Sequence, residues 1–416
     1  MGRGLTTDSR AFLVVVDPGD LAYRDAVAEA TIDLGEADRA LFEELDAQGN
    51  PCGAVPAQRL EQVWVWLLAG ETRPHTPRCY RVVTTPRESG GEPWHREEGV
   101  RFRIWHGDAD QDRALDIEID GECFATYNYG WRHGSLYKPF FHPIYGPAGV
   151  PVTQNGEFPG TQRGHYWHHG LFIGHQHVNG ISFWEEREGE TGRILHRSFL
   201  RMDEGPVVGR FVERNLWRTP VGVDLLDERR EVWIYRLPPN QRILDFRLSL
   251  KPVDEPVTLG KTAYNLLACH VPRGMHVADP LSAYDLRMYR SSEMRPGVRG
   301  GRVVTSEGEI NVERHHATAG GRARWMDHSG PVEGHWQGVA IFDHPLNPRY
   351  PTYWLNWNNM TYGPSFTFSE PYTIERDRPL VLRYRVYIHD GDAASGRVEQ
   401  RWQEFACQPA ITVRRA

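Results

Sequence analysis

The sequence contains no hydrophobic run long enough to cross a membrane. The apolar stretch AFLVVV at residues 11–16 has six residues, whereas a signal-peptide core needs about 7–15 and a membrane span about 20. We therefore expect no membrane partner, and we interpret AFLVVV as a first buried strand.

Paired-cysteine motifs and basic clusters are also missing. The chain has five cysteines, without CxxC spacing, and a net charge of −7 with scattered Lys and Arg residues. An odd number of unpaired cysteines is typical of a reducing compartment, which predicts a cytoplasmic location. Scattered basic residues predict no nucleic-acid partner.

Helical periodicity is scarce, and residues 281–293 are the best candidate for a helix. Short alternating runs separated by Gly, Pro, Asp and Asn recur instead, such as VRFRIWH and LDIEIDGECFATY, with Asp120-Gly121 as a hairpin turn. This rhythm predicts an all-β chain built as a large antiparallel β-sandwich with long ordered loops.

The length of 416 residues favours two domains. The polar segment RESGGEPWHREEG at residues 87–99 is the candidate boundary between an N-terminal β region, 1–87, and a main β-sandwich domain, 100–416. One continuous sandwich is the alternative.

The segment from His165 to Glu186 is the most unusual part of the chain, because five of the 19 histidines fall in its first thirteen residues. In a regular strand, His169, His175 and His177 share one face, and His175 and His177 lie roughly 6.5–7 Å apart. That spacing lets both rings bind one divalent metal ion. A third ligand would come from a set of other histidines and glutamates: His142, His169, Glu185, Glu186, His315, His328 or His344.

Other interpretations of this segment stay open. A cupin motif would continue to a glutamate four or five residues after the histidine pair, where this chain has Ile181 and Ser182. The histidines can instead hydrogen-bond within a polar sheet face without any metal. The glycines at 164, 170, 174 and 180 indicate bulges or close backbone approaches.

A second polar and aromatic group lies between Asp327 and Trp354. Asp327, His328 and Ser329 invite comparison with a hydrolase triad, but neighbours in sequence do not normally assemble that geometry and no GxSxG elbow is present. Asp343 and Asn347, each close to a proline, are equally interpretable as loop-forming residues.

Several ordered motifs of the chain resemble one bacterial family. They are AVPAQ, WVWLLAGETR, HPIYGPAGVPVT, HHGLFIGH, ARWMDHSGP, GVAIFDHPLNPR and LRYRVYIHDGD. Together they are similar to the family labelled methane oxygenase PmoA, over most of the chain. The label does not fit literally, because the integral-membrane methane monooxygenase needs membrane spans.

The resemblance implies a soluble β-sandwich of the super-sandwich kind, with a galactose-mutarotase-like arrangement as one candidate, and a link to carbohydrate metabolism. Two departures stand out. The family's Lys-Glu-Gly group is Lys261-Thr262-Ala263 here, and its HHRG motif is shortened to His168-His169-Gly170, without the arginine.

We therefore predict an enzyme that cleaves a glycosidic C–O bond as a lyase or hydrolase, with a small carbohydrate, such as a 3-oxo-glycoside, as its partner. A base removes the acidified proton at C2, a cation stabilises the enolate and an acid protonates the departing oxygen. The alternatives are a non-catalytic sugar-binding protein and a metal-dependent oxygenase. The sequence makes no prediction of oligomeric state.

The predicted site residues are assigned by role. The catalytic candidates are His169, His175, His177, Glu186, Lys261 and Asp343, of which His175 and His177 are also the metal candidates. The substrate-binding candidates are His142, Tyr145, Trp167, His168, Asn179, Trp184, His328, His344, Asn347, Arg349 and Trp354.

Overall fold

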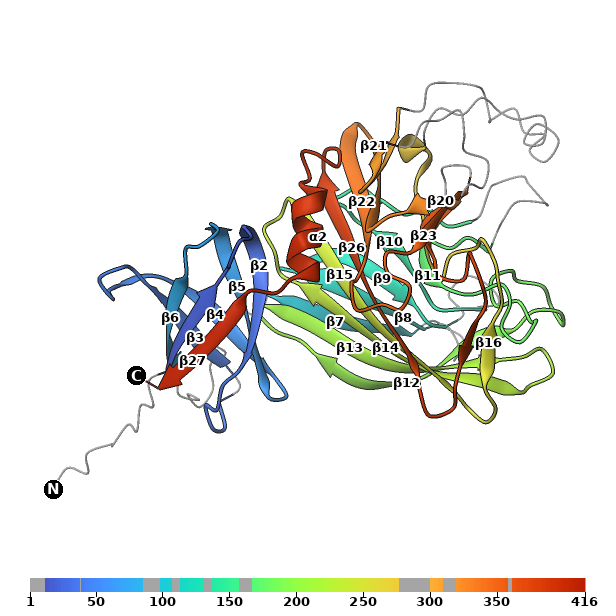
Figure 1. Ribbon diagram of the computed structural model, residues 1–416, viewed down its shortest axis with the longest axis horizontal. Helices are drawn as coiled ribbons and strands as arrows, with labels where there is room; N and C mark the ends of the chain where they lie inside the picture. Colours follow the sequence, from blue (N-terminus) through green and yellow to red (C-terminus); the bar gives the residue numbers. More distant parts are fainter. Residues whose placement is uncertain are drawn as a thin grey trace.

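The computed structural model describes residues 12–37, 39–84, 98–106, 113–130, 137–156, 167–276, 300–309, 319–357 and 361–415. Within these ranges the chain is almost entirely antiparallel β-structure, with one α-helix, α2 (Val398–Ala406), and one 3₁₀ turn, η1 (Arg273–Met275) (Figure 1). The predicted all-β fold class is confirmed.

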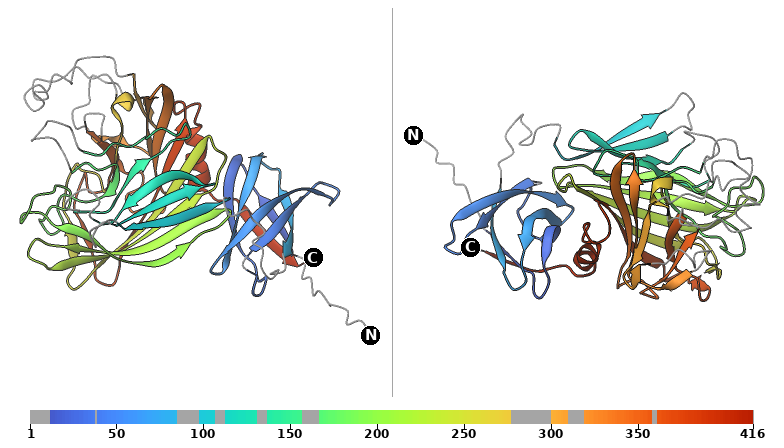
Figure 2. Two further views of the ribbon diagram at one scale, coloured as in Figure 1. Left: turned by 180° about the vertical axis from the view of Figure 1, so that it is seen from behind. Right: turned by 90° about the horizontal axis from the view of Figure 1, so that it is seen from above.

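The N-terminal domain is a seven-stranded sheet in the described part of the chain. Its order is β2 (Tyr23–Thr31), β5 (Val63–Thr72), β4 (Pro51–Leu60), β3 (Arg39–Leu45), β6 (Arg78–Thr84), β1 (Phe12–Asp17) and β27 (Ala410–Arg415). The last strand returns from the far end of the chain and pairs with β1, with Phe12 opposite Arg415 (Figures 1 and 2). Residues 410–415 therefore belong to the N-terminal sheet, whereas the sequence prediction assigned them to the main domain.

The main domain consists of two nine-stranded sheets in the described residues, which we call the short-stranded and the long-stranded sheet. The short-stranded sheet has the order β20 (Ala319–Arg322), β23 (Tyr353–Trp357), β24 (Thr361–Ser365), β17 (Leu267–His270), β11 (Leu171–Ile173), β10 (Phe140–Ile144), β9 (Glu122–Asn128), β8 (Arg113–Ile119) and β7 (Val100–His106). The long-stranded sheet has the order β12 (Arg193–Asp203), β13 (Val208–Arg218), β14 (Asp224–Tyr235), β15 (Gln241–Pro252), β26 (Leu380–Asp390), β22 (His335–Asp343), β21 (Trp325–Val332), β18 (Arg302–Thr305) and β19 (Gly308–Glu309). A separate pair joins β16 (Val257–Leu259) to β25 (Tyr372–Ile374).

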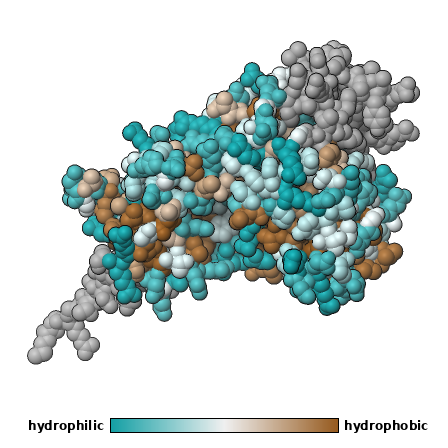
Figure 3. Space-filling view, in the orientation of Figure 1, coloured by the Kyte–Doolittle hydropathy of each residue, from teal (hydrophilic) through white to brown (hydrophobic). Residues whose placement is uncertain are grey.

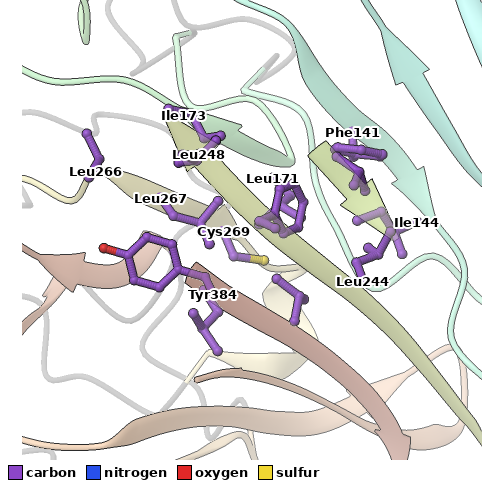
Figure 4. Close-up of a cluster of buried hydrophobic side chains, with 14 of the residues drawn as sticks. Phe141, Ile144, Leu171, Ile173, Leu244, Leu248, Leu266, Leu267, Cys269 and Tyr384 are labelled. Atoms are coloured by element: carbon purple, nitrogen blue, oxygen red, sulfur yellow. The ribbon is translucent and has the colours of Figure 1, made fainter. Parts of the chain in front are cut away.

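The core of the main domain lies between these two sheets. Along β15, Leu244, Phe246, Leu248 and Leu250 are buried, while Arg247 between them points to the opposite face and is exposed. Leucines from β15 pack with Phe141, Ile144 and Leu171 of the short-stranded sheet (Figure 4). Because successive side chains of a strand point to opposite faces, the apolar residues of β15 fill the core and the polar residues between them lie on the outer face of the sheet.

The N-terminal domain rests on the long-stranded sheet. The Gln58 amide oxygen accepts hydrogen bonds from Val207 N (3.3 Å) and Val208 N (3.1 Å), and the amide nitrogen donates to Val208 O (3.0 Å). On the other side, the Glu404 carboxylate of α2 accepts a hydrogen bond from Arg24 N at 2.8 Å. A shared hydrophobic cluster that includes Val65, Val208 and Trp402 fills the junction, so α2 lies between the two domains (Figure 1).

Several local predictions can be compared with the structure. Residues 12–16 of the AFLVVV stretch lie in β1, and Asp120 and Gly121 adopt positive φ angles of 55° and 82° in the β8–β9 hairpin, both as expected. Helix α2 was not predicted. The helix expected at residues 281–293 and nearly all of the boundary segment 87–99 lie outside the described residues.

In the view of Figure 3, hydrophobic patches lie on the N-terminal domain and on the lower part of the main domain, and hydrophilic residues cover much of the rest. Among the described residues, no helix has the length and apolar character needed to cross a membrane.

Candidate functional site

The histidine-rich segment does not form the regular strand that its alternation predicts. Strand β11 ends at Ile173, and the following residues form turns and isolated bridges. Gly174 follows the last residue of the strand, and a Cβ there would lie 2.8 Å from Phe183 O. Gly170 is equally restricted, since its Cβ would lie 2.2 Å from Phe141 O. Both glycines mark close backbone approaches, as the sequence indicated.

The two histidines of the predicted metal pair have different environments. His175 is buried; its Nε2 lies 2.8 Å from Thr367 Oγ1 and its Nδ1 accepts a hydrogen bond from His177 N at 3.2 Å. His177 is exposed. Burial, reinforced by the nearby His177, lowers the pKa of His175 to about 3. The expectation that His169, His175 and His177 share one face is wrong, because the strand ends before the second of them.

His169 lies in a buried polar chain instead. Its Nε2 is 2.8 Å from Glu186 Oε1 and its Nδ1 is 2.7 Å from Asn155 Oδ1. Gly156 N donates to the same Asn155 atom at 3.0 Å, which identifies that atom as the amide oxygen. The ring stacks on Phe140, with centroids 4.4 Å apart.

Glu186 is the centre of this chain. Its Oε1 also accepts a hydrogen bond from Lys138 Nζ at 2.8 Å, and the two side chains are 6% and 1% exposed. Burial opposes ionisation of Glu186, but Lys138 and then His169 outweigh it and lower the pKa of the carboxyl to about 2. Burial lowers the pKa of Lys138, while Glu186 acts to raise it. Glu186 is consequently a permanent carboxylate that fixes the orientation of His169.

A cavity of about 610 Å³ opens beside Asn155. Its polar lining consists of His142, Tyr145, Thr153, Gln154, Asn155 and Glu333. His142 and Tyr145 come from the region of β10, whereas Glu333 occupies the tight turn between β21 and β22. The cavity thus joins the histidine-rich half of the chain to the Asp327–Trp354 region, and through Asn155 it reaches the His169–Glu186 pair.

The other described residues of the histidine-rich segment do not line the cavity. His168 is buried, with its Nδ1 3.2 Å from Thr361 Oγ1, and Trp184 is buried against Phe172. Asn179 forms an exposed Asn-Gly turn with positive φ. Trp167 is half-buried, and His165 and Tyr166 lie outside the described residues.

Asp343 and Asn347 hold a loop together. Asp343 accepts hydrogen bonds from Asn347 Nδ2 (2.7 Å), His344 N (3.0 Å) and Thr352 N (3.0 Å). Asn347 in turn binds the backbone of Arg383 through both its amide atoms. Burial raises the pKa of Asp343 to about 7, against these donors. The loop-forming interpretation of these two residues accounts for all of their contacts.

The other predicted residues are spread over the main domain. Arg349 donates to the backbone oxygens of Phe366 and Pro371, Trp354 is fully buried, and Lys261 is exposed. His328 is buried and stacks on Tyr362, with centroids 4.0 Å apart.

The comparison with a hydrolase triad fails on geometry. Asp327 pairs with His389 rather than with its neighbour His328, at 3.0 Å between Asp327 Oδ1 and His389 Nε2. All three residues are buried, as is Ser329, so the group is part of the core of the long-stranded sheet.

Sequence reasoning missed a second buried polar network. Glu213 binds Tyr127 and His196, and Glu228 binds Arg230 at 2.6 Å and the indole nitrogen of Trp217 at 2.6 Å. Glu213 and Glu228 are both 0% exposed. Their alternation with apolar residues on β13 and β14 was the available signal, since charged residues at inward positions require partners.

Metal ligation receives no geometric support among the described residues, where no three His, Cys, Asp or Glu side chains are grouped to hold an ion. His315, one of the expected ligands, lies outside the described residues.

Comparison with known proteins identifies a family for this chain. The sequence profile of a family of unknown function, DUF6807, matches residues 114–403. A search of curated proteins gave no match. Among solved structures, a proposed mutarotase from Salmonella typhimurium is similar with a TM-score of 0.27 and 7% sequence identity, over 70% of this chain and 97% of that chain. At this TM-score the similarity supports no conclusion about the present chain.

Proposed function

The chain belongs to the family of unknown function DUF6807, and from the cavity beside Asn155 we propose that it is a carbohydrate-active enzyme that cleaves a glycosidic C–O bond. The observation that carries the proposal is the convergence of His142 and Glu333 on one polar cavity of about 610 Å³. That volume lies within the range of about 300–1,000 Å³ typical of small-molecule sites.

The lining favours a neutral, hydroxyl-rich ligand. Tyr145, Thr153, Gln154 and Asn155 supply hydroxyl and amide groups that both donate and accept hydrogen bonds. None of the described residues that line the cavity is a lysine or arginine. A phosphorylated or carboxylated ligand would lack a countercharge here, whereas a sugar finds partners for its hydroxyl groups.

His142 is the proposed base. Its Nδ1 lies 3.1 Å from Thr153 Oγ1, and Thr153 Oγ1 also accepts a hydrogen bond from Ile144 N at 3.0 Å. The threonine is thereby fixed by the backbone and in turn orients the imidazole. Histidine is suited to proton transfer near neutral pH.

Glu333 is the proposed acid. It occupies a two-residue hairpin turn with a positive φ of 49°, a conformation that favours Asn, Asp or Gly over glutamate. A strained residue beside a cavity motivates a functional hypothesis. Glu333 lines the cavity from the turn of the β21–β22 hairpin.

The reaction proceeds as an elimination on a 3-oxo-glycoside. His142 removes the C2 proton, which the adjacent carbonyl acidifies, and the electron pair of that C–H bond forms a C1–C2 double bond. The C1–O bond breaks, and Glu333 gives its proton to the departing oxygen. The products are a free alcohol and an unsaturated keto sugar. His169 and Glu186 are positioning residues, because they hold Asn155 at the cavity wall.

The test is a panel of glycosides and their 3-oxo derivatives, with release of the aglycone as the measurement. We expect release from at least one 3-oxo derivative, and a loss of about 10²–10⁴ in kcat for His142→Gln and for Glu333→Gln. His177→Gln is the matched control, because His177 is exposed and outside the cavity lining.

Product analysis separates the outcomes. An unsaturated sugar identifies a lyase, and a hydrated sugar identifies a hydrolase that uses the same cavity. Saturable binding of a glycoside without any product would replace the enzyme with a sugar-binding protein. Turnover that is unchanged in both variants would refute the assignment of the base and the acid.

A further inference from the structure

A second, smaller cleft lies where the two domains meet. Its volume is about 250 Å³, and its walls come from β2 of the N-terminal sheet, from β14, β15 and β26 of the long-stranded sheet, and from the end of α2. The floor is the outer face of the long-stranded sheet, opposite to the face that forms the hydrophobic core. The cleft is therefore separate from the cavity beside Asn155.

Two arginines stand side by side on this floor. Arg247 on β15 and Arg383 on β26 are directly opposite each other in the antiparallel register, and both line the cleft. Like charges in directly opposite positions destabilise a sheet. Burial and then the neighbouring Arg247 lower the pKa of Arg383, which expresses the same repulsion.

Neither arginine has a carboxylate partner among the residues that the structure describes. Glu231 stands opposite Arg247 on β14, but its carboxylate pairs with Arg210 at 3.3 Å and with Arg229 at 3.2 Å. Two adjacent guanidinium groups without a countercharge form a receptor for an anion.

The neighbouring cross-strand pair on the same face of the sheet combines opposite charges instead of like charges. Asp245 on β15 is opposite Arg385 on β26, and the guanidinium binds the carboxylate through two hydrogen bonds of 2.6 and 2.7 Å. The Tyr235 hydroxyl donates to the same carboxylate at 3.0 Å. Asp245 therefore neutralises the charge of Arg385, whereas Arg247 and Arg383 have no such carboxylate partner among the described residues.

The opposite wall carries one further charge and one imidazole. Glu29 on β2 lines the cleft without an ion pair to any described residue, and burial raises its pKa, with Asp245 and Glu231 adding to the effect. His344 lines the other end and packs against Phe405 of α2. The cleft thus has cationic groups on its floor and a hydrogen-bond acceptor on its wall.

We propose that the interdomain cleft binds a small sugar anion, with its carboxylate or phosphate between Arg247 and Arg383 and a hydroxyl group donated to Glu29. Two guanidinium groups match the paired oxygens of either anion. The volume of about 250 Å³ accommodates a ligand of monosaccharide size. Because β2 and β26 belong to different domains, a bound ligand contacts both of them.

The first experiment is calorimetric titration of the full chain with glucuronate, glucose 6-phosphate, glucose and sulfate at constant ionic strength. We expect saturable binding of glucuronate or glucose 6-phosphate and none of glucose, and the tighter of the two anions identifies carboxylate or phosphate as the group recognised. Equal, weak binding of all anions including sulfate would mean an adventitious ion only and would overturn the proposal, as would no binding at all.

Variants locate the site. Arg247→Gln and Arg383→Gln should each weaken the sugar anion at least tenfold. Lys251→Gln is the matched control, because Lys251 lies on the same strand and face as Arg247 but outside the cleft lining. Equal weakening by Lys251→Gln would indicate a general charge effect and contradict the assignment.

Glu29→Ala tests the opposite wall. It should weaken the sugar anion several-fold, because the hydroxyl acceptor is lost, while binding of inorganic phosphate becomes tighter, because a nearby negative charge is removed. Aglycone release should be unchanged in Arg247→Gln. This outcome separates the cleft from the cavity beside Asn155, so either proposal can fail without the other.

Discussion

Lys138 Nζ lies 2.8 Å from Glu186 Oε1, and both side chains are almost completely buried. Removal of one partner of such an ion pair strongly destabilises the folded protein, because the other charge is left buried without a partner. This pair holds the carboxylate whose Oε1 lies 2.8 Å from His169 Nε2.

Lys138→Met should lower the free energy of unfolding by about 3–5 kcal/mol, and Glu186→Gln by a similar amount. The double variant Lys138→Met/Glu186→Gln should recover much of the loss, since it leaves no unpaired charge. Urea denaturation of all four proteins gives the coupling energy, which we expect to exceed about 2 kcal/mol. Additive losses would contradict a direct ion pair.

His175 should make the protein sensitive to acid. Its pKa is lowered from 6.5 to about 3 in the folded state. Below the unfolded value, the unfolded chain binds a proton that the folded ring does not, so stability is lost as the pH falls from 6.5 towards 3. The loss should reach about 2–3 kcal/mol at pH 4.5.

His175→Gln removes this contribution, so its unfolding free energy should fall less between pH 7 and pH 4.5 than that of the wild type. His177→Gln, at an exposed position, should keep the wild-type pH dependence. Identical slopes for His175→Gln and the wild type would show that the ring titrates normally.

Asn347→Ala should destabilise the protein by about 2–3 kcal/mol, because a buried side chain loses its hydrogen bonds to Asp343 and to the Arg383 backbone. Leu346→Ala, at a neighbouring residue that is 68% exposed, should change stability by less than about 0.5 kcal/mol. Thermal or urea unfolding checks both. Loss of aglycone release in Asn347→Ala without loss of stability would instead restore its predicted role in substrate binding.

Gly170→Ala should be strongly destabilising, by roughly 2 kcal/mol or more, because the new Cβ would lie 2.2 Å from Phe141 O. Gly53→Ala is the control, because a Cβ there meets nothing within 4 Å. A tolerated Gly170→Ala variant would mean that β10 and β11 can separate.

The fold was largely predictable from alternation and turn residues. The pattern ILDFRLSLKP is a sandwich strand with one buried and one exposed face, and β15 has that burial. Helix α2 was missed, although Val398, Trp402 and Phe405 have the i, i+4, i+7 spacing of one helix face. The return of β27 to β1 was not predictable, since no local pattern shows which strand a segment pairs with.

The site was predictable in residue type and only partly in geometry. His169 and Glu186 were named, and they meet; Lys138 and Asn155, which complete their chain, come from other segments. The predicted pair of His175 and His177 failed because the period-two argument needs an unbroken strand, whereas β11 ends at Ile173. Arg247 and Arg383 are separated by more than a hundred residues, and only the sheet register brings them together.

The pairing of β27 with β1 determines when the N-terminal sheet can be completed during synthesis on the ribosome. The N-terminal sheet contains six strands from the first 84 residues, but its edge at β1 stays open until residues 410–415 have been synthesised. An open edge strand is a template for pairing with another chain. The strands of residues 12–84 are thus synthesised long before the strand that completes their sheet, and a chain that stops before Ala410 should be prone to aggregate through β1.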